Sequence, residues 1–155
     1  MTEPHAPPPY GSYAGLAAAF FGALALAART SHPERELRPV DLVALGLATF
    51  KASRTLSRDK VASFLREPFV EEEAYDGHEH ATGTGTRRAI GELVTCTRCV
   101  GTWTAAGLAV SEAAAPRFGR LLVWTLNAAA LNDFLQAAFV ALAHKSNELE
   151  RRVGA

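Results

Sequence analysis

The sequence predicts an all-α integral membrane protein, a helical bundle with three or four membrane helices and a cytoplasmic loop. Three runs of small or apolar residues have about the length that a helix needs to cross a bilayer: residues 10–28, 93–111 and 121–143, of 19, 19 and 23 residues. The only charges in them are Arg98 and Asp133. Because many of these positions are Ala, Gly or Thr, a compact soluble bundle with buried helices is the alternative fold.

The chain has no net charge, and this limits the kinds of partner that it can attract by charge alone. Sixteen basic and sixteen acidic side chains cancel, so nothing indicates nucleic acid. We expect membrane lipid, and a second copy or a partner membrane protein, to surround the helices.

The N-terminal third is predicted to be a tail followed by a helix. Residues 1–9 are rich in proline and are expected to be disordered. The first helix follows at residues 10–28, with tyrosines at its start as interface anchors. It opens the helical membrane domain, residues 10–144.

The second segment is short for a membrane crossing. Only nine uncharged residues, 42–50, lie between Asp41 and Lys51. The segment spans only if Lys51 and Arg54 extend their charged ends to the membrane surface. Otherwise it forms an interfacial helix.

A loop follows at residues 67–86. Its first part is acidic and its last part is rich in Gly and Thr, so the loop is expected to be mobile. A third helix is predicted from about Arg87, carrying both cysteines. Residues 117–120 are predicted to form a turn, and the last helix to end near His144. Residues 145–155 form a charged C-terminal tail.

The basic residues predict the orientation in the membrane, because Lys and Arg are enriched on the cytoplasmic side. If the second segment does not span, 13 Lys and Arg share a side with the loop and the tail, against two on the other side. If it spans, the numbers are ten and five. Both cases place the loop, the cysteine pair and the C-terminus in the cytoplasm.

Cys96 and Cys99 are the strongest chemical feature. They are expected on nearly one face at the start of a helix, where the helix dipole and Arg98 favour thiolates. They suit a thiol-redox centre, or a zinc site completed by His78 and His80. The preferred interpretation is that they pack as small apolar side chains and that the protein has no cofactor. Bound zinc is the alternative.

Polar residues in the last apolar run form a second feature: Asp133, Asn132 and Asn127. A carboxylate in a bilayer is costly unless it is paired, so Asp133 should face the bundle. Its available partners are Arg54, Lys51 and Arg98. An ion pair that fixes helix packing is preferred over an ion or proton path.

A basic amphipathic pattern follows the second segment. Its basic residues alternate with apolar ones and suit a membrane surface rich in anionic lipid, although a solvated helix face would look the same. These basic residues are Arg54, Arg58, Lys60 and Arg66.

Two blocks of sequence carry a family resemblance. The first is KASRTLSRDKV at residues 51–61 with FLREPF at 64–69, and the second is GELVTCTRC at 91–99 with Gly101 and Trp103. Together they resemble domain of unknown function 1360, a family of small bacterial membrane proteins that includes one named for sporulation. The resemblance implies an integral membrane protein with the cysteine pair and no established activity. Its members usually have apolar residues or proline between the cysteines, where this chain has Thr97 and Arg98.

These observations favour a structural or regulatory membrane subunit that acts through helix contacts, rather than an enzyme. A metal-binding or thiol-redox protein built on Cys96 and Cys99 is the second interpretation. An oligomeric transporter or channel subunit built around Asp133 is the third.

Overall fold

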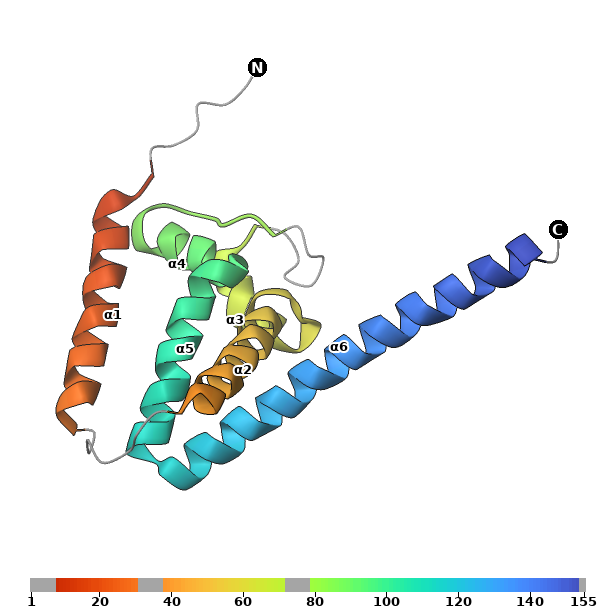
Figure 1. Cartoon of the computed structure of the whole chain (residues 1–155). Helices are drawn as coiled ribbons and strands as arrows, with labels where there is room; N and C mark the ends of the chain where they lie inside the picture. Colours follow the sequence, from red (N-terminus) through yellow and green to blue (C-terminus); the bar gives the residue numbers. More distant parts are fainter. Residues whose placement is uncertain (1–7, 31–37, 72–78, 154–155) are drawn as a thin grey trace, which may run out of the picture.

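The computed structural model describes residues 8–30, 38–71 and 79–153 (Figure 1). Within these ranges every element is a helix, apart from one antiparallel bridge between Val70 and Ala81. The all-helical prediction is therefore confirmed. In chain order the elements are α1 (Tyr10–Thr30), α2 (Pro39–Arg58), η1 (Lys60–Ala62), α3 (Ser63–Arg66), η2 (Glu67–Phe69), α4 (Gly85–Thr95), α5 (Thr97–Ala114) and α6 (Pro116–Val153).

Two helices are long and apolar enough to cross a membrane: α1 over Tyr10–Arg29 and α6 over Pro116–Arg152. The bent pair α4–α5 would make a third if it counts as one span. The second segment, α2, does not meet the same test of length and composition. This agrees with its short apolar run.

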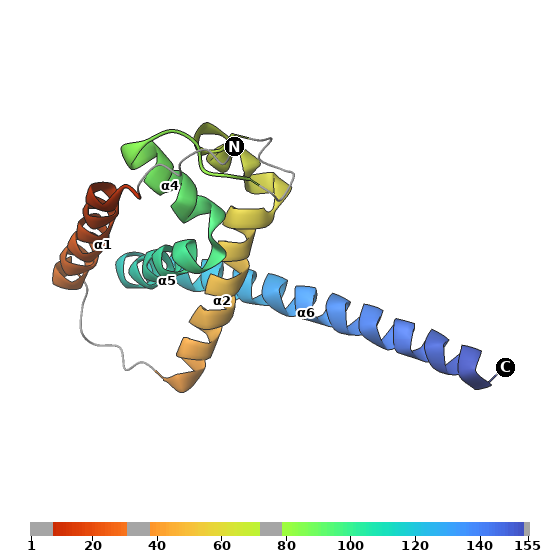
Figure 2. The ribbon, with the colours of Figure 1, turned by 90° about the horizontal axis from the view of Figure 1, so that it is seen from above.

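The centre of the bundle is the contact of α2, α5 and α6 (Figure 2). Ala48, Leu108 and Val123, one from each helix, form its buried cluster. Helix α1 flanks this unit by packing on α5 and α4. Its Phe20 ring meets Trp103 of α5 edge to face at a centroid distance of 5.1 Å. The core is small, because most large apolar side chains of α6 remain exposed, as do Tyr10, Phe21 and Leu26 of α1.

One end of the bundle is closed by residues 59–71 and 79–95, which we call the cap. The Val70–Ala81 bridge holds its two halves together. The Thr82 N–H donates to the Phe69 carbonyl at 2.9 Å, and the Glu71 N–H to the His80 carbonyl at 3.1 Å. The predicted mobile loop is thus tied down in its described parts. Residues 72–78 and the tail residues 1–7 lie outside the described residues.

The helix predicted from Arg87 onward is corrected by the structure. It breaks at Cys96, whose extended backbone (φ −96°, ψ 103°) bends α4 and α5 by 86°. Gly91 on α4 packs so tightly on the cap that a Cβ there would lie 2.5 Å from the Phe69 carbonyl oxygen. This close packing turns α4 out of line with α5.

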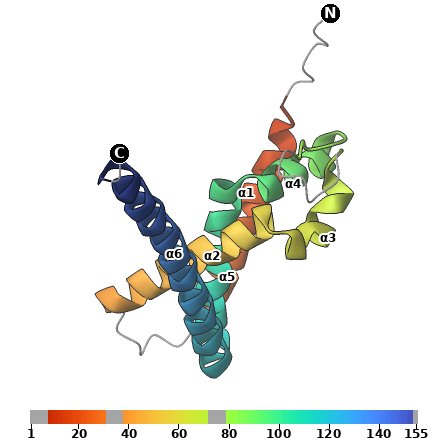
Figure 3. The same ribbon diagram turned by 90° about the vertical axis from the view of Figure 1, so that its right-hand side faces the viewer.

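The end of the chain also differs from the prediction. Helix α6 begins at Pro116, directly after α5, so residues 117–120 are helical rather than a turn. The charged tail continues α6 to Val153. Lys145 and Arg152 both pair with Glu148 at helical spacing, which supports these last turns. Figures 1 and 3 show this part of α6 extending away from the other helices.

Candidate functional site

The strongest polar contact between the long helices joins α2 to α6. Lys51 Nζ lies 2.9 Å from Asp133 Oδ2 and 3.9 Å from Asp59 Oδ2. Thr55 Oγ1 donates to the same Asp59 oxygen at 2.7 Å. The Phe50 and Phe134 rings stack beside the pair at a centroid distance of 5.2 Å. Lys51 is therefore the partner of Asp133 among the three that the sequence offered.

The other polar residues of this region separate. Arg54 on α2, Arg98 on α5 and Asn132 on α6 are exposed. Asn127 lies two turns before Asp133, and its Oδ1 is buried without a hydrogen-bond partner. The structure therefore joins Lys51 to Asp133 between two helices and does not bring Asn132 to them.

A second ionic contact lies in the cap, and the sequence did not reveal it. Arg66 is fully buried and reaches Glu79 Oε1 at 3.1 Å. Its other nitrogen donates to the carbonyls of Leu56 at 2.8 Å and Asp59 at 3.2 Å, at the end of α2. Arg66 thereby joins α2 to the segment that follows residue 78. A polar side chain needs such partners to be buried.

The predicted basic membrane-surface face must be corrected on this point. Arg54, Arg58 and Lys60 are exposed, whereas Arg66 points inward. Alternation of basic and apolar residues cannot separate an outward arginine from one that binds the carbonyl groups at a helix end. The only signal in the sequence is the proline at 68, which ends the short helix and allows the chain to fold back.

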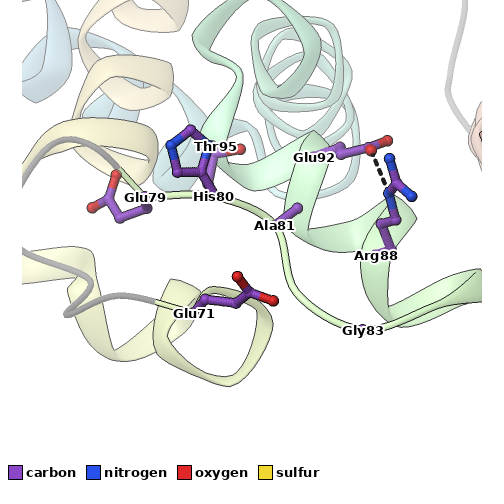
Figure 4. A pocket seen from close by; sticks show the side chains of 8 residues that line it. All are labelled: Glu71, Glu79, His80, Ala81, Gly83, Arg88, Glu92 and Thr95. Carbon is purple, nitrogen blue, oxygen red and sulfur yellow. Dashed lines mark hydrogen bonds and ion pairs between the residues drawn. The ribbon is translucent and has the colours of Figure 1, made fainter. Parts of the chain in front are cut away.

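A polar depression of about 450 Å³ lies on the surface of the cap (Figure 4). Its charged groups already have partners within the chain. Glu92 accepts from Arg88 Nε at 2.9 Å and from the Tyr13 hydroxyl of α1, and Glu71 accepts from Thr82 Oγ1 at 3.1 Å. These contacts join α1 to α4 and join the two chain segments on either side of the Val70–Ala81 bridge. The charged side chains of the depression therefore stabilise the fold.

The cysteines lie at the elbow between α4 and α5. Cys96 caps the N-terminus of α5, and Cys99 lies in its first turn and is exposed. The two form a disulfide with a Cα–Cα distance of 5.2 Å. This corrects the expectation of two separate thiols on one helix face. The break in the helix puts the sulfurs within bonding distance.

The zinc interpretation finds no assembled site in the described part of the chain. No group of three or more His, Cys, Asp or Glu side chains has the arrangement of a metal site within those residues. His80 is exposed on the cap segment and lines the polar depression. His78 lies outside the described residues.

Fold and sites together define the class of protein: a small all-helical protein with two or three helices suited to a membrane. Comparison with known sequences gives the family. The family described as protein of unknown function (DUF1360) matches residues 44–139, well over half of the chain. The chain belongs to this family.

A curated relative of the chain is the sporulation protein YjcA of Bacillus subtilis (strain 168). The two are 34% identical over 102 residues, which cover 61% of this chain and 86% of the relative. No solved structure is detectably similar. The residues that match the family, 44–139, contain most of α2, the cap, α5 and most of α6. They therefore include the Lys51–Asp133 contact, the Arg66–Glu79 pair and the disulfide.

Proposed function

We propose that this protein is a multi-pass subunit of the bacterial cell membrane that acts through contacts of its helices with a second copy or a partner membrane protein. One observation carries the proposal: much of the apolar surface of the two long helices is not buried against the rest of the chain. None of the apolar window of α1 and only 6% of that of α6 is buried. Continuous apolar surface of this kind marks a membrane or a protein partner.

The exposed apolar side chains run along the length of α6 rather than forming one small patch. At 1.5 Å per residue, the 23-residue run 121–143 measures roughly 35 Å, enough for the hydrocarbon core. The large exposed apolar residues of α6 are Phe118, Leu121, Trp124, Leu131, Phe134, Leu135, Phe139, Val140, Leu142 and Leu149.

The arrangement of the helices supports four crossings, with α2 as one of them although its apolar run is short. Ser12 and Tyr13 at the start of α1 contact α4 of the cap, so α1 leaves from the cap end (Figure 1). Helix α2 ends in the cap and therefore returns to it. We infer that the N-terminus, the cap and the C-terminus share the cytoplasmic side, with ten Lys and Arg against five.

The Lys51–Asp133 pair supports a packing role over an ion path. Both side chains are engaged with each other across the α2–α6 contact, with 20% and 38% of their surfaces exposed. A carboxylate that fixes helix packing needs a permanent partner of this kind. A carboxylate in a transport site must instead be able to leave its partner to bind an ion or a proton.

Topology is tested by labelling single cysteines in a chain that carries Cys96→Ser and Cys99→Ser. We expect Lys60→Cys and Ser146→Cys to react with a membrane-impermeant maleimide only after the cells are opened. Ala115→Cys, at the corner of α5 and α6, should react in intact cells. Equal labelling of all three sites in intact cells would reject the arrangement.

Self-association is tested on two adjacent positions of α6 in the same background. Leu131 is 56% exposed and Ala130 is fully buried. Mild oxidation in membranes should cross-link two copies through Leu131→Cys but not through Ala130→Cys. If Leu131→Cys and neighbouring exposed positions give only monomers, the contacts are not between copies of this chain.

A further inference from the structure

The Cys96–Cys99 disulfide has no part in the helix contacts proposed above. It contributes little to the fold, because a bridge between residues three apart closes a very short loop and so restricts the unfolded chain least. The start of α5 is also attached to α2 without it, because Ser57 Oγ of α2 and Thr97 Oγ1 of α5 are 2.7 Å apart. Stabilisation of the fold therefore does not explain why this disulfide is present.

The two sulfurs occupy different environments. Cys99 is exposed, whereas Cys96 is partly buried at the end of α4. The backbone N–H of Cys99 donates to Cys96 Sγ at 3.2 Å. The N-terminus of α5 also favours negative charge at this sulfur. One sulfur can thus be reached from outside, and the other is prepared to carry a thiolate.

We propose that Cys96 and Cys99 form a thiol–disulfide exchange site whose partner is a protein dithiol. A thiolate of the partner attacks Cys99 Sγ and forms a mixed disulfide. The Cys96–Cys99 bond breaks, and its electron pair leaves on Cys96 Sγ, stabilised by the Cys99 N–H.

The second thiol of the partner then attacks the partner sulfur of the mixed disulfide, and Cys99 leaves as a thiolate. The partner is oxidised to a disulfide, and Cys96 and Cys99 are reduced to two thiols that receive the two protons. The reverse reaction regenerates the disulfide from an oxidised partner.

The cytoplasmic position proposed for the cysteine pair favours a reactive disulfide over a permanent one. This step alone rests on the orientation proposed above. Disulfides are rare in the cytoplasm, and those that form there are mostly catalytic or redox-sensing. The exchange reaction itself does not depend on which side the cap faces. Failure of the topology experiment would therefore leave the exchange site standing, and the two tests can fail separately.

The first experiment uses the purified full-length chain in detergent, without added reductant. Reduced thioredoxin serves as the protein dithiol, and thiols are counted by the gel shift of a maleimide-polyethylene glycol label. We expect two new thiols within minutes at an equimolar ratio, and their loss on addition of oxidised thioredoxin. A disulfide that persists in excess reduced thioredoxin overturns the proposal, as does about one bound zinc per chain that Cys96→Ser and Cys99→Ser remove.

The second experiment tests the inequality of the two sulfurs by iodoacetamide alkylation at pH 7. Cys99→Ser keeps the backbone N–H at residue 99, so Cys96 should react about fivefold faster than an ordinary exposed thiol. Cys96→Ser should leave Cys99 at the ordinary rate. Ser146→Cys in the double-serine chain supplies that reference. Equal rates for Cys96 and Cys99, or a faster Cys99, overturn the assignment.

Discussion

The buried Arg66–Glu79 pair provides the sharpest test of how the cap is held. Glu79→Gln removes the negative charge but keeps a similar shape. The side chains of Arg66 and Glu79 are 0% and 1% exposed, so water cannot replace the lost charge. Removing one partner of a buried ion pair costs roughly 3–5 kcal/mol. We expect about 3 kcal/mol, the lower end, because the amide oxygen of Gln can still accept one hydrogen bond.

The cost should appear as local opening of the cap rather than unfolding of the bundle. At 1.36 kcal/mol per factor of ten, 3 kcal/mol is a roughly 160-fold larger opening constant. Hydrogen exchange measured by mass spectrometry in detergent would show it in peptides from residues 59–71 and 79–95. Peptides from α5 and α6 serve as the internal reference.

A matched variant distinguishes the effect of losing a buried charge from the effect of losing any negative charge in the cap. Glu71→Gln lies across the bridge on an exposed side chain and should leave exchange of the cap within about twofold of the wild type. The apolar double variant Arg66→Met/Glu79→Leu should recover much of the protection, because it buries no charge. Unchanged exchange in Glu79→Gln, or a double variant as open as the single one, would refute the reasoning.

Two further sets of substitutions test the close packing at Gly91 and the contact between α2 and α6. Gly91→Ala should lower the thermal midpoint in detergent by destabilising the cap by about 1–3 kcal/mol, because its Cβ would lie 2.5 Å from the Phe69 carbonyl oxygen. Gly107→Ala, with open space around it, should have a neutral or small effect, and equal effects would contradict the packing. For the α2–α6 contact, a double-mutant cycle of Lys51→Met and Asp133→Asn should give a coupling of about 1 kcal/mol. A coupling near zero in thermal unfolding would show that the pair does not fix these helices.

The local pattern of the sequence determined the helical class and the two helices that are long and apolar enough to cross a membrane. Both are properties of consecutive residues: the length of an apolar run fixes whether a helix can cross a bilayer. The cost of an unpaired carboxylate in an apolar segment also placed Lys51 among the partners of Asp133. The family resemblance rests on two blocks of sequence and needed no coordinates.

Tertiary contacts decided the remainder. The elbow at Cys96 depends on α4 packing against a cap segment that is distant in sequence, so the local pattern predicted one helix through both cysteines. The same bend brings the two sulfurs together. Arg66 has the sequence surroundings of a surface residue, yet it is buried because Glu79 and the carbonyl groups at the end of α2 converge on it. Burial of a charge depends on groups far apart in the chain, and only the folded structure brings them together.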